Sequence, residues 1–182
     1  FGLVLALMIA LTGFGIQKVD FIERTLTEIT DVNAVKQRYA INFRGSVHDR
    51  AISLRDVTLL ESPADLTATL AEIDRLSAFY SEAAQALDSI FAADSAIPDE
   101  EKVLLAAIKS IEQRTLPLAS QIIAARQAGD IDSARRILLT QARPALSDWL
   151  ASINRFIDYQ EEKNRVATAH ARTIAGQFAL LM

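Results

Sequence analysis

The sequence predicts an all-α protein: an up-down-up-down antiparallel four-helix bundle whose outer helices continue into two clipped transmembrane spans. The composition is the first observation, because 51% of the residues are hydrophobic while only 6 glycines and 4 prolines occur among 182 residues. The second is periodicity, since apolar residues recur every three or four positions and no stretch alternates as a β-strand does. The third is that three short segments with helix start and stop signals divide the chain into four long helices.

The N-terminal segment is predicted to be part of a first transmembrane helix, at residues 1–17. Residues 1–16 carry no charge and are almost wholly apolar. They are fewer than the roughly 20 residues needed to cross a bilayer, but the chain begins with Phe1 rather than Met, so we expect a piece of a longer protein. The alternative is a signal peptide, which should end in a cleavage site and a break. Helical periodicity instead continues through Ile16 to Val19 and Ile22.

Three segments mark the boundaries between helices. In ESPADL, Ser62 stands before Pro63, which is an N-cap followed by proline at the first helical position. In ADSAIPDEE, Pro98 precedes acidic residues that suit a helix N-terminus. In QAGDIDSA, Gly129 ends one helix and Asp130 caps the next. The predicted helices therefore lie at residues 18–60, 63–93, 98–128 and 130–172.

Each predicted helix has one seam with the 3.5-residue repeat of helices that pack in a bundle. Pro117 and Pro144 fall inside the third and fourth helices, and each should kink or locally open its helix. The first helix has the longest seam, which runs through Val19, Ile22, Leu26, Ile29, Asn33, Lys36, Ala40, Phe43, Val47, Arg50, Leu54 and Val57.

The C-terminal segment TIAGQFALLM, residues 173–182, turns apolar again. We expect it to begin a second transmembrane helix, and the alternative is a buried terminal helix. The predicted organisation is thus a partial transmembrane helix at 1–17, a four-helix bundle at 18–172 and the start of a second transmembrane helix at 173–182.

The stretch INFRGSVHDRAISLRDV, residues 41–57, places three arginines in a helix that should pack. Arg50 occupies a seam position, and an unpaired guanidinium in a core costs several kcal/mol. Something anionic must therefore face it. Two interpretations stand: an internal partner, with Asp74 on the second helix about level with Arg50, or an anionic ligand.

A second group of basic residues lies on another face of the first helix. Arg44 and Arg55 are eleven residues apart, about three turns, and share a face with His48. An anionic ligand would relieve the repulsion of such gathered charges, and the arginine fork suits a carboxylate. The alternative is that Arg44 and Arg55 are solvated charges paired with Asp49 or Asp56. At the same level, the fourth helix contributes Arg136, Thr140 and Arg143.

Several classes of function are disfavoured. The net charge of −4, with both signs mixed along the chain, argues against a nucleic-acid binder. The absence of cysteine excludes disulfides and thiolate metal sites. The two histidines, His48 and His170, are far apart, and no Glu-x-x-His pair, phosphate loop or nucleophile motif occurs. We therefore expect no enzyme, no catalytic residue, no metal and no cofactor.

The stretch INFRGSVHDRAISLRDVTLL resembles the first ectodomain helix of bacterial methyl-accepting chemotaxis proteins with a four-helix-bundle ligand-binding domain. AGDIDSARRILLTQARPAL resembles the tip and fourth helix of the same family, and the resemblance covers essentially the whole chain. In its aspartate-receptor branch, three arginines of the first helix bind the carboxylates of the ligand across a dimer interface. A threonine and backbone groups of the fourth helix hold its amino group.

By position, the resemblance implies that Arg44, Arg50 and Arg55 are the three arginines and that Thr140 is the threonine. The spacing of six and five residues departs from the aspartate-receptor pattern. The resemblance also implies a homodimer in the bacterial inner membrane, a periplasmic sensor domain and a separate cytoplasmic signalling part. The expected ligand is a small organic acid or amino acid, and a periplasmic binding protein is left open as a further partner.

Two other functions remain open. The same bundle also serves as the input domain of sensor histidine kinases and cyclic-dinucleotide enzymes, and a ligand-free protein-interaction module is a third interpretation. The interaction module predicts that Arg50 pairs internally and that no small molecule stabilises the fold.

Overall fold

A computed structural model describes the backbone of residues 1–181 and the side chains of residues 1–177. Those residues form helices and short connections, with no strand among them. The chain divides into two units, which are described separately. One comprises Phe1–Gln37 with the residues from Gln160 onward, and the other is Arg38–Tyr159.

The helices follow the order expected from the sequence. The first long helix consists of α1 (Gly2–Thr27), the π-helix η1 (Glu28–Asn33) and α2 (Ala34–Val57). It is followed by α3 (Pro63–Ala93) and α4 (Asp99–Gln127). The last long helix consists of α5 (Ile131–Ile137), the π-helix η2 (Leu138–Ala142) and α6 (Arg143–Leu181). The predicted all-α class is confirmed, and α3 has the predicted bounds.

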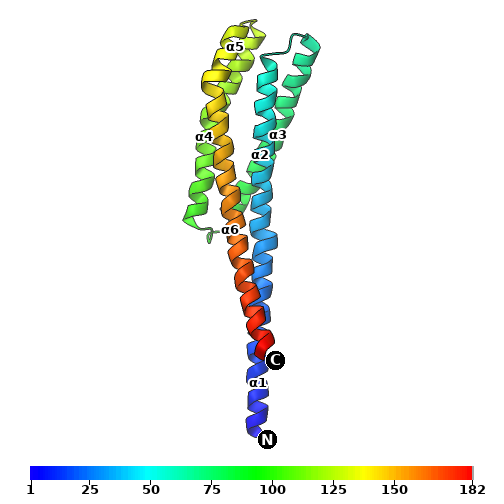
Figure 1. Cartoon of the computed structure of the whole chain (residues 1–182), viewed down its shortest axis with the longest axis vertical. Helices are drawn as coiled ribbons and strands as arrows, with labels where there is room; N and C mark the ends of the chain where they lie inside the picture. Colours follow the sequence, from blue (N-terminus) through cyan, green and yellow to red (C-terminus); the bar gives the residue numbers. More distant parts are fainter. Residues whose placement is uncertain (182) are drawn as a thin grey trace. The chain divides into compact units, whose positions relative to one another are not determined.

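The unit Arg38–Tyr159 is a four-helix bundle. Within it, α2, α3, α4 and the α5–η2–α6 helix lie side by side, joined by short loops (Figure 1). The seam of α2 from Ala40 to Val57 is buried, as the periodicity predicts. An aromatic group occupies the centre of the core: the Tyr80 ring stacks on Phe43 at 4.4 Å between centroids and meets the edge of Trp149 at 5.3 Å.

The helix boundaries arise from local capping. The hydroxyl of Ser62 accepts a hydrogen bond from the Asp65 backbone N–H at 3.3 Å, and Pro63 opens α3. The carboxylate of Asp130 accepts from the Ser133 N–H at 3.0 Å. Gly129 has a φ of 79°, the left-handed conformation that ends a helix at low cost only for glycine.

The two internal prolines behave differently. Pro144 follows directly on η2, where the backbone widens to a π-helix, so the predicted local opening occurs just before it. At Pro117, α4 stays α-helical on both sides. A proline removes one backbone hydrogen bond, and at Pro117 this loss does not change the type of helix. The other π-helix, η1, has no signal in the sequence that we can identify.

The unit built from Phe1–Gln37 and the residues from Gln160 onward brings α1, η1 and the start of α2 against the end of α6. The ring of Phe21 meets His170 at 5.1 Å between centroids, and Gln37 donates a hydrogen bond to Glu161 at 2.9 Å. The seam prediction is wrong at two positions here, because the side chains of Val19 and Leu26 are 55% and 52% exposed. Further along the same seam, Asn33 and Lys36 are buried at 1% exposure each.

One helical stretch near the N-terminus is long and apolar enough to cross a membrane, and none of its apolar window is buried, within the residues that the structure describes. The second span, predicted at residues 173–182, stays a prediction. Its side chains from residue 178 onward, and all of residue 182, lie outside the described part of the chain. The predicted limits of the sensor domain at 18 and 172 are likewise untested.

Candidate functional site

A groove of about 470 Å³ lies on the bundle between α2 and the η2–α6 helix. Its volume falls within the roughly 300–1,000 Å³ of small-molecule sites in proteins. Helix α2 contributes one wall and η2–α6 the other. The lining residues are His48, Ala51, Ile52, Arg55, Leu138, Leu139, Arg143, Leu146, Ser147 and Leu150.

Helical spacing explains why these side chains meet. On α2, His48, Ile52 and Arg55 follow one another by four and three residues, which places them on one face. On the opposite wall, Leu139, Arg143 and later lining residues are also three or four apart. The groove therefore joins two helix faces that are far apart in the sequence, and both lie within a few turns of the connections at 58–62 and 128–130.

The basic groups of the groove are exposed and only lightly paired. Arg55 donates to Asp56 at 3.3 Å, and His48 contacts Asp49 at 3.1 Å. Exposed pairs of neighbouring residues hold each other weakly, typically by less than about 1 kcal/mol. Arg143 makes no hydrogen bond or ion pair with any side chain that the structure describes. All three can therefore turn toward an anion at little cost.

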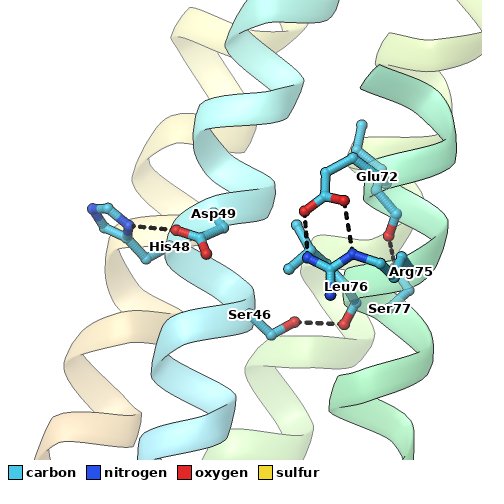
Figure 2. Close-up of polar contacts among 8 residues, drawn as sticks. Ser46, His48, Asp49, Glu72, Arg75, Leu76 and Ser77 are labelled. Carbon is cyan, nitrogen blue, oxygen red and sulfur yellow. Dashed lines mark hydrogen bonds and ion pairs between the residues drawn. The ribbon is translucent and has the colours of Figure 1, made fainter. Parts of the chain in front are cut away.

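Helix α2 presents different chemistry on its other faces. Figure 2 shows His48 on the side of α2 away from α3, while Ser46 points toward α3. The buried hydroxyl of Ser46 donates to the Leu76 carbonyl at 2.7 Å. This bond fixes α2 against α3 and keeps His48 on the groove side.

Arg50 lies in the core of the bundle and not in the groove. Its side chain is 6% exposed, and its guanidinium carbon lies 5.1 Å from the centroid of the Tyr80 ring and 4.9 Å from that of Trp149. One nitrogen donates a long hydrogen bond of 3.5 Å to Ser77, and Nε and Nη2 have no acceptor in the described structure. Of the two interpretations, the geometry favours internal partners. These are aromatic rings and not Asp74, which is exposed on α3.

The electrostatics of this cluster are dominated by burial. Burial lowers the pKa of Arg50, and the acidic groups Tyr80 and Glu112 offset part of that effect. Burial likewise raises the pKa of Glu112, which accepts a hydrogen bond from the Tyr80 hydroxyl at 3.3 Å. The Tyr80 phenol pKa is raised above its usual range, again mainly by burial. Burial disfavours the charged form of each of these three groups.

The other predicted site residues lie outside the groove lining. Arg44 is exposed on α2. Arg136 is exposed and donates to Ser133 at 3.0 Å. The Thr140 hydroxyl donates to the backbone carbonyl of Arg136 at 2.7 Å, a bond within its own helix. The structure thus brings together His48, Arg55 and Arg143 and leaves Arg44, Arg136 and Thr140 around them.

Sequence reasoning missed the apolar part of the groove. Leu139 follows the buried Leu138, and Ile52 lies two residues from both Arg50 and Leu54, yet Leu139 and Ile52 are 60% and 39% exposed. Their signal in the sequence is an apolar residue off the seam, on the face that also bears arginine. Among the side chains that the structure describes, no three from His, Asp or Glu stand close enough to hold a metal ion.

Comparison with known families identifies this architecture. Residues 1–175 match the family described as the four helix bundle sensory module for signal transduction, which is found in methyl-accepting chemotaxis proteins. The match covers almost the whole chain, so this chain belongs to that family. Searches of curated proteins and of solved structures each found no match.

Proposed function

We propose that this sensory module is the periplasmic sensor of a transmembrane chemoreceptor and that it binds a small organic acid or amino acid in the groove between α2 and η2–α6. The observation that carries the proposal is the placing of Arg55, Arg143 and His48 around one groove of about 470 Å³ on a bundle of this family. Arginine forms paired, charge-assisted hydrogen bonds with carboxylates.

Membrane attachment is part of the proposal. The exposed apolar helix at the N-terminus supports a first span, and the apolar residues 173–182 support a second. Two spans would attach both ends of the chain to the same membrane. A homodimer of such bundles would bring a second α2 beside the first and could add the exposed Arg44 of a second copy to the site.

The signal would travel along α6. This helix contributes Arg143 to the groove and continues to Leu181, so a ligand that contacts Arg143 acts directly on the segment that leads toward the second span. Binding shifts helices only by as much as the ligand prefers one arrangement over the other. Insertion of a flexible Gly pair beside Arg172, in a receptor that carries a cytoplasmic signalling domain, should uncouple output from ligand. Unchanged signalling after that insertion would exclude a shift of α6.

A thermal-shift screen of the chain in detergent tests the binding step. The panel contains dicarboxylic acids, aromatic acids and amino acids. A ligand at a hundredfold excess over its dissociation constant should stabilise the bundle by about 2.7 kcal/mol. The double variant Arg55→Gln with Arg143→Gln should lose this gain, while the exposed arginine variant Arg114→Gln on α4 should keep it. If no acid stabilises the bundle, or if the double variant responds like the parent, the proposed site is wrong.

A further inference from the structure

The lining of the groove indicates the polarity of the ligand's body as well as the charge of the ligand. Six of its ten lining residues are aliphatic, and they come from both walls. Leu139 and Ile52 are 60% and 39% exposed, so the groove keeps apolar surface in contact with water. Such surface is favourable to cover, and a ligand with an apolar body would cover it.

The ionisable groups that line the groove are all basic, and Ser147 adds a neutral hydroxyl. Arg55 and Arg143 are permanent cations, one on each wall, and His48 can also be positive. No acidic side chain is among the ten lining residues in the described structure. An α-amino acid brings an ammonium group, and that group would meet the arginines, while the adjacent carboxylates of Asp56 and Asp49 already contact Arg55 and His48. The groove is therefore complementary to an anionic ligand that carries no ammonium or other positive group.

A short dicarboxylate would use the arginines but leave most of the aliphatic lining uncovered. Each carboxylate is strongly hydrated, and one that lay against the leucine side chains instead of the second arginine would lose water without gaining a hydrogen bond. A single carboxylate, held by Arg143 or Arg55, leaves the rest of the ligand free to lie on the leucines. The basic residues and the aliphatic side chains of the groove are together complementary to an amphipathic acid.

We propose that the groove selects a monocarboxylate with an aromatic or branched aliphatic body. This inference rests on the proposed function, because it assumes that the groove is the ligand site. It commits to a small acid as the occupant, since the cations of both walls complement a carboxylate. A second copy of this chain, laying an apolar face on the groove, is the competing occupant.

Calorimetry with the full chain in detergent tests the proposal. The probes are benzoate and 4-methylpentanoate as apolar monocarboxylates, succinate as a dicarboxylate, L-leucine as an amino acid and benzyl alcohol as an uncharged analogue. Benzoate or 4-methylpentanoate should bind at least about tenfold more tightly than the other three, since the loss of either the charge or the apolar contact costs roughly 1.4 kcal/mol or more.

Two variants separate the contributions of charge and apolar contact. Arg143→Gln should weaken the apolar acids about tenfold. Leu139→Gln, at an exposed position that tolerates a polar side chain, should weaken them about fivefold and leave succinate unchanged. The matched controls are Arg114→Gln and Leu116→Gln, both on α4 away from the groove; Leu116 is 40% exposed. The affinities of the control variants for the apolar acids should stay within about twofold of the parent's.

The outcomes distinguish the two levels of the proposal. If succinate or L-leucine binds most tightly, depends on Arg143 and ignores Leu139→Gln, the ligand class is wrong and the proposed function stands. If no probe binds and none of the wider acid panel stabilises the bundle, both fail. If Leu139→Gln converts a dimer to a monomer in sedimentation while no acid binds, the groove is an interface between copies, and the proposal is overturned.

Discussion

Replacing Arg50 by methionine tests whether this buried charge holds the bundle together. The guanidinium is 6% exposed, two of its nitrogens have no acceptor in the described structure, and burial lowers its pKa. Such burial costs several kcal/mol. The two ring contacts, at 5.1 and 4.9 Å, return about 2 kcal/mol each when desolvated. For the charged side chain, the cost of burial and the gain from the two ring contacts therefore nearly cancel.

Methionine has a similar length, carries no charge and packs favourably against aromatic rings. Burying its side chain contributes roughly 1.5–3 kcal/mol. We therefore expect Arg50→Met to raise the free energy of unfolding by about 1–2 kcal/mol and the melting temperature by about 2–4 °C for each kcal/mol. Arg50→Ala removes the same charge but leaves a cavity, and should lower the stability by about 2 kcal/mol or more.

Trp149 is a convenient probe for this experiment, because it is the only tryptophan in the chain and lies against Arg50. Denaturant titrations of the chain in detergent, followed by its fluorescence, report on the bundle itself. Arg44→Met, at an exposed position on the same helix, should change the stability by less than about 0.5 kcal/mol. A loss of more than about 1 kcal/mol in Arg50→Met would refute the reasoning. Loss of acid binding in this variant would make Arg50 a ligand group after all.

Three further predictions concern other parts of the bundle. Glu112→Gln tests the raised pKa of this carboxyl. Because the native state holds the proton more tightly than the unfolded state, the protonated carboxyl stabilises the fold. This contribution is complete below the ordinary pKa of 4.5 and is lost as the pH rises through the higher native pKa. The parent should therefore gain stability relative to Glu112→Gln as the pH falls toward 4.5 in fluorescence-monitored unfolding, and a difference that does not vary with pH would contradict the assignment. Arg126→Met removes hydrogen bonds of 3.0 Å to the carbonyl of Val57, at the end of α2, and of 2.8 Å to that of Leu60, in the connection after it. This change should speed amide hydrogen exchange in residues 58–62 without affecting the loop at 94–98. Equal exchange in both proteins would show that these bonds do not hold the connection in place. Ser62→Ala removes the N-cap of α3 and should cost about 1 kcal/mol in thermal unfolding, whereas Ser81→Ala, within the same helix, should cost less than half as much; equal losses would argue against the cap.

The sequence alone determined the class and the divisions of this fold, because the signals for them act over a few residues. Ser62 and Asp130 accept bonds from backbone N–H groups three residues ahead, so the starts of α3 and α5 could be predicted from local chemistry. The seam of α2 follows from a periodicity that any window of two turns contains. The same seam failed at Val19 and Leu26, whose side chains are exposed.

The surroundings of each arginine depend on the tertiary structure. The position of Arg50 on the seam predicted burial, but its partners, Tyr80 and Trp149, come from α3 and α6 and depend on the rotation of three helices. The sequence predicted Arg55 and Arg143 at the same level, yet the leucines that line the same groove could be identified only from the packing of the two helices. Local periodicity specifies which face of a helix a side chain occupies. The register between helices specifies which residues of the neighbouring helices lie opposite that side chain. This register arises from packing over the whole bundle.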